Sequence, residues 1–133
     1  MRYILKVALI AAAGSLFSLL LFPAWLSCSD QRLDDSLAEA KKGKRFVMLE
    51  LGSVGCIPCE AMRPVMAKLS LTYKGKLEVI FVDVSKDNKT ARQFRVFGIP
   101  TQVFLDRNGK EFHRHVGFYA YDQIVLVLKK AGI

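Results

Sequence analysis

Cys56 and Cys59 are separated by only two residues, a spacing that lets two sulfurs form a small disulfide ring or work together as a dithiol. Residues 46–51 are mostly apolar and predict a buried strand, and the apolar spacing over residues 60–73 predicts a helix. The pair therefore stands at the start of a helix. Unpaired N–H groups there stabilise a thiolate, the species that attacks disulfides.

Other chemistry for the pair fits the residues less well. A structural disulfide across so short a loop restricts the unfolded chain little. A zinc site needs about four ligands, and the only further cysteine and histidines are Cys28, His113 and His115. The two histidines alternate along a predicted strand, so we expect them to share one face as surface residues rather than metal ligands. A c-type haem would need histidine directly after the second cysteine, where the chain has Glu60. We therefore expect redox chemistry, with no metal.

The first 28 residues differ from the rest. Residues 7–26 contain no charge, which is long enough for a membrane-spanning helix and also compatible with a secretory signal. Arg2 and Lys6 precede this stretch and predict that the N-terminus stays in the cytoplasm while the remainder is exported. We expect a hydrophobic signal or anchor segment over 1–28 and one domain over 29–133.

Cys28 allows three outcomes for this segment. Small residues around it form a weak signal-peptidase site, and the sequence ending at Cys28 resembles a bacterial lipoprotein box, although Trp25 departs from that pattern. The segment is then a retained anchor, a lipid-bearing terminus, or a signal whose removal releases a soluble domain. All three predict an extracytoplasmic, periplasmic domain, and a lipid on Cys28 would explain an unpaired third cysteine.

Charge excludes little. The chain has 20 Lys and Arg against 12 Asp and Glu, a net charge of +8. The basic residues are spread thinly, with no basic stripe interleaved with aromatic residues, so nucleic-acid binding is not favoured. We expect a solvated basic surface that lies near anionic lipid or an acidic redox partner.

Helices and strands alternate after the first segment. Asp106–Gly109 predicts a hairpin turn, and Ser85 or Asp87 is expected to cap a short helix. The order predicts an α/β domain whose central mixed sheet has helices on both faces, with the strand at 77–84 buried on both sides. Expected helices are 30–42, 57–73, 87–94 and 121–131, and expected strands are 46–51, 77–84, 101–105 and 111–116.

Four motifs in this order resemble the thioredoxin superfamily over residues 30–133. Cys56–Cys59 is similar to that family's Cys-Gly-Pro-Cys, and Pro64 falls where the family has a helix-kinking proline. Gly98–Thr101 resembles its Gly-Ile-Pro-Thr loop, and Gly117 matches a glycine at the last strand. The resemblance implies a thioredoxin fold preceded by the N-terminal hydrophobic helix.

The resemblance also implies roles. Cys56 is expected to be the attacking thiolate and Cys59 the resolving thiol that breaks the mixed disulfide. Pro58 would stiffen the first turn of the helix, and Ile57 would form an apolar rim beside the sulfur.

A second set of residues is expected to bind the substrate. The peptide bond before Pro100 is expected to be cis, with the proline against the cysteine pair. The Ile99 backbone would then pair with an extended substrate segment by strand addition, beside Gly117.

The chain departs from thioredoxins at three positions. Gly55 replaces a tryptophan before the first cysteine, which alters the usual contact surface. Glu50 takes the place of a buried Asp, and Phe81 takes the place of its lysine partner. A buried Glu50 without a counter-charge should have a raised pKa and could relay the Cys59 proton. The alternative is that Glu50 is an edge residue facing water.

We therefore expect a tethered thiol–disulfide oxidoreductase that reduces disulfides of exported proteins, with the Cys56–Cys59 disulfide as its only redox group. Because the periplasm is kept oxidising, electrons would have to come from a membrane partner. Two other classes remain open: a copper chaperone using the same thiolates, and a thioredoxin-fold protein that binds exported chains without turnover.

Overall fold

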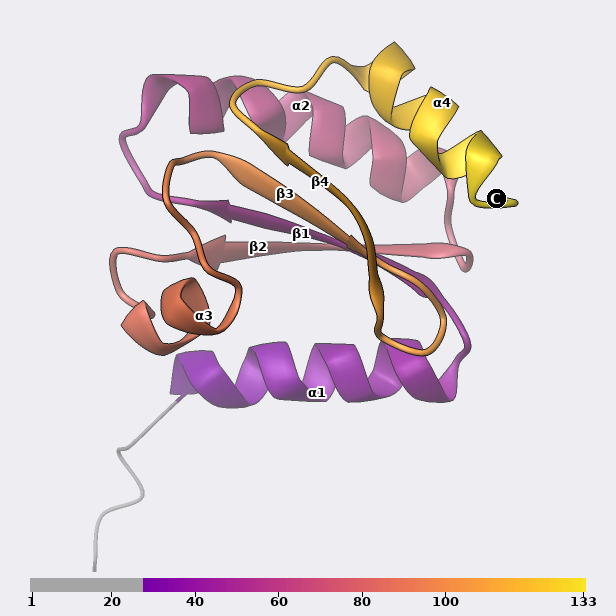
Figure 1. Cartoon of the computed structure of the whole chain (residues 1–133), viewed down its shortest axis with the longest axis horizontal. Coiled ribbons are helices and arrows are strands. Elements are labelled where there is room, and N and C mark those ends of the chain that lie inside the picture. The colour runs from indigo at the N-terminus through magenta and orange to yellow at the C-terminus, as the bar shows by residue number, and fades with distance from the viewer. Residues whose placement is uncertain (1–27) are drawn as a thin grey trace, which may run out of the picture.

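The computed structural model describes residues 28–133, which fold into four helices and four strands (Figure 1). The elements follow the expected order along the chain, and all of their ends lie within two residues of the predicted ones. The elements are α1 Cys28–Lys42, β1 Phe46–Gly52, α2 Ile57–Thr72, β2 Leu77–Asp83, α3 Asn88–Gln93, β3 Thr101–Leu105, β4 Glu111–Val116 and α4 Tyr121–Lys130.

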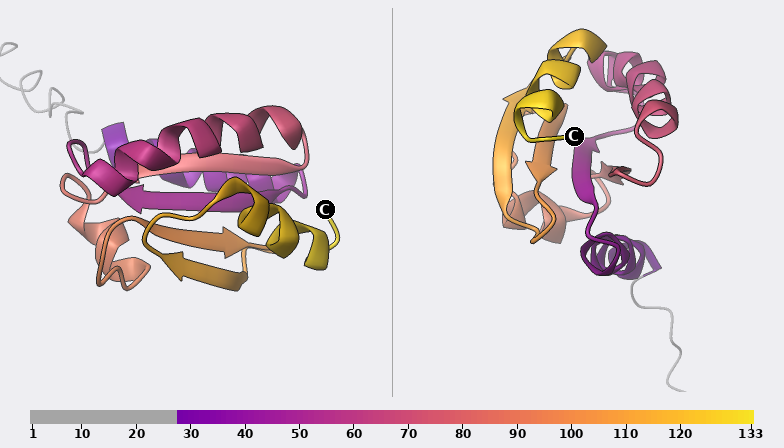
Figure 2. Two further views of the ribbon diagram at one scale, coloured as in Figure 1. Left: turned by 90° about the horizontal axis from the view of Figure 1, so that it is seen from above. Right: turned by 90° about the vertical axis from the view of Figure 1, so that its right-hand side faces the viewer.

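The four strands form one mixed sheet in the order β2-β1-β3-β4. β1 is parallel to β2 and antiparallel to β3, and β3 is antiparallel to β4. α2 and α4 cover one face of the sheet, and α1 and α3 lie on the other (Figures 1 and 2). The structure confirms the predicted α/β architecture.

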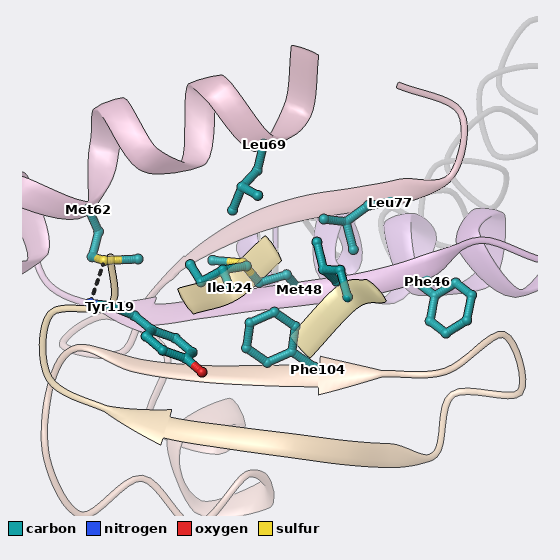
Figure 3. Packing of buried hydrophobic residues seen from close by; sticks show 9 residues of the cluster. Phe46, Met48, Met62, Leu69, Leu77, Phe104, Tyr119 and Ile124 are labelled. Carbon is teal, nitrogen blue, oxygen red and sulfur yellow. Dashed lines mark hydrogen bonds between the residues drawn. The ribbon is translucent and has the colours of Figure 1, made fainter. Parts of the chain in front are cut away.

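β1 is buried along its whole length because an apolar core packs on each of its two faces. Its side chains alternate between the faces, so Phe46 and Met48 pack under α2 and α4, whereas Val47, Leu49 and Leu51 pack against the α1 face. The first core is drawn in Figure 3. It contains Phe46, Met48, Met62, Leu69, Leu77, Phe104, Tyr119, Ile124 and Leu128.

The prediction that the strand at 77–84 is buried on both faces is wrong. β2 is an edge strand, and only Leu77 and Val82 within it are fully buried. Phe81 is 39% exposed. An apolar run is compatible with two-sided burial, but the position of a strand within a sheet depends on which strands pair with it, and β2 pairs only with β1.

Local polar contacts shape the connections that flank β3. The Asp87 side chain caps α3 by accepting a hydrogen bond from the Thr90 N–H at 2.9 Å, so Asp87 and not Ser85 is the cap. Asp106 accepts hydrogen bonds from the backbone N–H groups of Asn108 and Lys110, which closes the predicted turn between β3 and β4.

The hydrophobic segment at 7–26 lies outside the described residues. Among residues 28–133, no helix has the length and apolar character needed to cross a membrane.

The first core allows a matched test of packing. Phe104 is fully buried, with its ring in contact with those of Phe112, His113 and Tyr119, whereas Phe97 is 97% exposed. Phe104→Ala should therefore lower the free energy of unfolding by about 3–5 kcal/mol because it leaves a cavity. Phe97→Ala should change it by about 0.5 kcal/mol or less. Urea unfolding of the full chain, followed by circular dichroism, measures the free energy of unfolding of both variants. Equal losses of free energy would contradict the burial of Phe104 and the exposure of Phe97.

Candidate active site

The two cysteines lie where β1 leads into α2 (Figure 1). The intervening turn places Gly55 at a φ of 82°, a left-handed conformation that glycine adopts without steric cost. Cys56 is the N-cap of α2, with extended backbone and no side-chain hydrogen bond to the helix. Pro58 lies in the first helical turn, where a missing N–H leaves nothing unpaired. The local sequence thus places Cys56 at the positive end of the helix dipole.

Cys56 and Cys59 form a disulfide, with their Cα atoms 5.2 Å apart. The two residues differ in access to solvent. Cys59 is 3% exposed, whereas Cys56 is half-buried and is followed by Ile57, which is 84% exposed. A partner approaching from solvent therefore reaches Cys56 more readily than Cys59.

Gly52 allows α2 to lie close to the end of β1. A Cβ atom at this position would stand 3.1 Å from the Cys59 sulfur and 3.3 Å from the ring of Phe81. A larger residue would therefore require these neighbours to shift by a few tenths of an ångström. With no side chain at Gly52, Cys59 is buried against the end of β1 without any such shift.

The loop before β3 has the predicted cis peptide bond between Ile99 and Pro100. Two hydrogen bonds hold it: the Thr101 hydroxyl donates to the Gly98 carbonyl at 2.6 Å, and the Gly117 N–H donates to the Pro100 carbonyl at 2.8 Å. Within residues 28–133, the backbone of Ile99 makes no hydrogen bond and stays open.

The strand register brings this loop to the same end of the sheet as the cysteines. Leu51 pairs with Thr101, and Thr101 pairs in turn with Val116. The residues that adjoin this row are Gly52, Pro100 and Gly117. They therefore lie at one end of the sheet. A Cβ atom at Gly52 would stand beside the Cys59 sulfur, so the predicted cysteine pair and the predicted substrate loop lie at the same end of the sheet.

Glu50 is completely buried, which excludes the interpretation that it faces water. It points to the same face of β1 as Gly52 and lies opposite Phe81 of β2 and Gln102 of β3. Burial raises the pKa of Glu50 to about 7, against a smaller lowering by the hydrogen bond from Gln102. Among the described residues, its Oε2 atom has no hydrogen-bond partner. A carboxyl group with this pKa can both take up and release a proton near neutral pH.

Gln102 is the polar neighbour that sequence reasoning missed. It is fully buried, and its Nε2 lies 3.3 Å from Glu50 Oε1 and 3.2 Å from the Gly117 carbonyl oxygen. The signal available was a glutamine on the inward face of an otherwise apolar strand. Buried amides need partners, but the identity of the partner depends on strand pairing.

Exposed apolar side chains lie around the end of the sheet that carries the cysteines. They lie in the turn after β1, at the first residue of α2, in the loop before β3, at the last residue of β4 and in the connection that follows it. These side chains are Val54, Ile57, Phe97, Ile99, Val116 and Phe118, and we refer to them as the apolar rim. The chain thus presents apolar surface near the disulfide although Gly55 supplies none.

The histidines share one face, as predicted, and pack on an aromatic ring. His113 Nε2 lies 3.1 Å from the Tyr119 hydroxyl, and His115 stacks on the Tyr119 ring at 3.9 Å between centroids. Burial lowers the pKa of His113, helped by the nearby His115 and Lys130. Within residues 28–133, no three His, Cys, Asp or Glu side chains gather as they would around a metal ion. The side chain of Cys28 lies outside the described part of the structure.

Known proteins resemble this chain over the described domain. The family model described as "Thioredoxin-like domain" matches residues 33–132. A thioredoxin from Staphylococcus haemolyticus is 27% identical over 107 residues, covering 80% of this chain and 97% of the relative.

Solved thioredoxin structures share the fold. A thioredoxin from Nicotiana alata superposes with a TM-score of 0.66 and 26% identity, covering 77% of this chain and 86% of that one. A poplar thioredoxin h gives a TM-score of 0.69 at 21% identity, covering 79% and 93% of the two chains.

The family model spans most of the chain, and the structure adds a disulfide at the start of α2. A Cys-x-x-Cys pair in this position performs thiol–disulfide exchange. The chain therefore belongs to the thioredoxin-like family and is a thiol–disulfide oxidoreductase.

Proposed function

We propose that this oxidoreductase reduces disulfides in exported polypeptides on the outer side of the cytoplasmic membrane. The observation that carries the proposal is the asymmetry of the pair: Cys56 is accessible at the helix start, while Cys59 is 3% exposed and packed against Gly52. An accessible nucleophile beside a shielded resolving thiol suits release of a reduced product.

The first step forms a mixed disulfide. The Cys56 thiolate attacks one sulfur of the substrate disulfide, the substrate S–S bond breaks, and the other substrate sulfur leaves as a thiolate. The N-terminus of α2 stabilises the Cys56 thiolate before the attack.

The second step releases the product. Cys59 gives its proton to the Glu50 carboxylate and attacks the Cys56 sulfur; the mixed disulfide breaks and the second substrate thiolate leaves. Two electrons pass to the substrate and the Cys56–Cys59 disulfide forms. Glu50 suits this role because it is buried on the β1 face that also carries Gly52, and its pKa is about 7.

Substrate binding is proposed to combine backbone pairing with apolar contact. The open backbone of Ile99 would pair with an extended substrate segment, beside Pro100 and Gly117. Ile57 and Pro58 are both exposed next to Cys56 and would contact residues flanking the substrate cysteine.

The extracytoplasmic location rests on the uncharged stretch at 7–26 and the positive charges before it. The segment, or a lipid on Cys28, would tether the domain to the membrane. Reduction in an oxidising compartment consumes electrons, so a membrane protein that donates them is the proposed partner. The Cys56–Cys59 pair is the only redox group that the proposed reaction uses.

The role of each cysteine can be tested by alkylation of the reduced full chain. Iodoacetamide should label Cys56 before Cys59, with a pH midpoint below the ~8.5 of a free thiol, because the helix start stabilises the thiolate. Mass spectrometry of peptides after timed labelling reads both rates, with Cys59→Ser and Cys56→Ser as controls that each keep one thiol of the pair. Faster labelling of Cys59 would reverse the assignment.

The proton acceptor can be tested by pH dependence. In the parent, the rate at which Cys59 resolves a mixed disulfide should rise as Glu50 loses its proton, with a midpoint near its pKa of about 7. Glu50→Gln cannot accept the proton, so the same step should be at least about 10-fold slower at pH 7. Its midpoint should move toward the ~8.5 of a thiol. Stopped-flow release of a thiol leaving group measures the step. Identical pH profiles would exclude Glu50 as the acceptor.

The location can be tested with fusions after Ile133. A reporter enzyme that folds only in an oxidising compartment should be active, and one that works only in the cytoplasm should not, because positive charges precede the hydrophobic stretch. Cys28→Ala should change processing if the cysteine carries a lipid and should leave it unchanged if 7–26 is a plain anchor. A parent chain recovered fully soluble from a position near Asp30 would exclude both tethers, and an active cytoplasmic reporter would overturn export.

A further inference from the structure

Gln102 joins two parts of the site that lie far apart in the sequence. Its Nε2 atom carries two hydrogens, and the structure gives it two acceptors: Glu50 Oε1 at 3.3 Å and the Gly117 carbonyl at 3.2 Å. Both neighbours are acceptors when Glu50 is ionised, so the amide nitrogen must face them and the amide oxygen must face away. The unpartnered state of Gln102 Oε1 agrees with this orientation.

The connection continues to the substrate loop. Gly117 donates its N–H to the Pro100 carbonyl at 2.8 Å, so hydrogen bonds run from Glu50 through Gln102 and Gly117 to Pro100. Gly117 has a φ of 97°, and a Cβ atom placed on it would meet nothing within 4 Å. Its carbonyl accepts a hydrogen bond from Gln102 and its N–H donates one to Pro100, so both backbone groups connect this residue to the network.

We propose that Gln102 is a positioning residue that couples the protonation of Glu50 to the backbone of Gly117, which in turn holds the substrate loop at Pro100. An ionised carboxylate is a stronger acceptor than a neutral carboxyl group. Loss of the Glu50 proton therefore strengthens the Gln102–Glu50 hydrogen bond and changes the donor available to Gly117. Coupling between two sites is reciprocal, so a substrate that engages the loop also changes how readily Glu50 takes a proton.

Other charged or titratable groups near Glu50 could also affect Gly117, and their titration must be distinguished from that of Glu50. Cys56 and Cys59 do not titrate in the disulfide form. On α2, Arg63 lies over the exposed Phe81 ring and pairs with Glu60 at the surface.

On β4, His115 lies directly opposite Gln102, and His113 is the next residue on that face. The His115 ring also contacts the Phe118 carbonyl. Lys130 of α4 is the cation near His113. The two imidazoles are therefore the groups whose titration could reach Gly117 without passing through Glu50.

The experiment follows titration in the oxidised full chain by NMR, using the Glu50 side-chain carboxyl carbon and the Gly117 backbone amide. Both signals should share a midpoint near 7 in the parent, the pKa of Glu50. Glu50→Gln should remove that midpoint from the Gly117 signal, and His115→Gln should leave it in place. A Gly117 signal that never follows Glu50, or still does in Glu50→Gln, would overturn the coupling.

Gln102→Met keeps the length of the side chain but removes both donors. It should raise the Glu50 midpoint by about one unit, because a hydrogen bond to the charged form is lost, and it should uncouple Gly117. Val103→Ala, a buried change on the opposite face of β3, is the structural control and should alter neither signal. An unchanged Glu50 midpoint in Gln102→Met would overturn the role; if that variant does not fold, the parent and Glu50→Gln spectra still decide it.

This inference rests on the proposed role of Glu50 as proton acceptor, but its test reads titration and not turnover. A protein in which Glu50 and Gly117 titrate together, yet Glu50→Gln resolves mixed disulfides at the parental rate, would keep the coupling and lose the relay. If Gly117 does not follow the titration of Glu50, but Glu50→Gln resolves mixed disulfides slowly, the relay is kept and the coupling is lost.

Discussion

The close contact between Gly52 and Cys59 is the constraint on which the site depends. A Cβ atom at residue 52 would come within 3.1 Å of the Cys59 sulfur, so a larger residue would require Cys59 or the Phe81 ring to give way by a few tenths of an ångström. This contact buries Cys59 and leaves Cys56 at the N-cap, half-exposed. The difference between an accessible and a shielded sulfur follows from packing, because the two residues are chemically identical.

Burying the ionised Glu50 carboxylate costs free energy that the packing of the core does not offset. It lies in the first core's face of β1, between Phe81 and Gln102, with one oxygen unpartnered. Its ionised form is penalised by burial, which is why its pKa rises to about 7. An apolar residue would pack there without this cost. A carboxyl group with a pKa near neutrality instead suits the proton transfer that we propose for this site.

Most of the fold could be predicted from local patterns. The apolar spacing of 60–73 determines a helix, and the turn at Asp106–Gly109 determines where β3 returns as β4. The edge position of β2 could not be predicted in this way. Its apolar run suits a central strand equally well, and only the pairing of β3 with the other side of β1 leaves β2 at the edge. The cap of α3 shows the same limit on a smaller scale: Ser85 and Asp87 have similar propensities, and the backbone geometry selects Asp87.

For the site, the sequence by itself determined the reactive pair, its place between a strand and a helix, and the loop that contains Pro100, because these depend on residues within a few positions of each other. Tertiary structure decided what surrounds them. Whether Glu50 faces water or a core depends on the register of β1 within the sheet, and its meeting with Gln102 spans 52 residues of chain. Contacts of that range form only when the strands pair. The electrostatic environment of the redox pair is therefore a property of the folded sheet, whereas its chemistry is already present in the order of its amino acids.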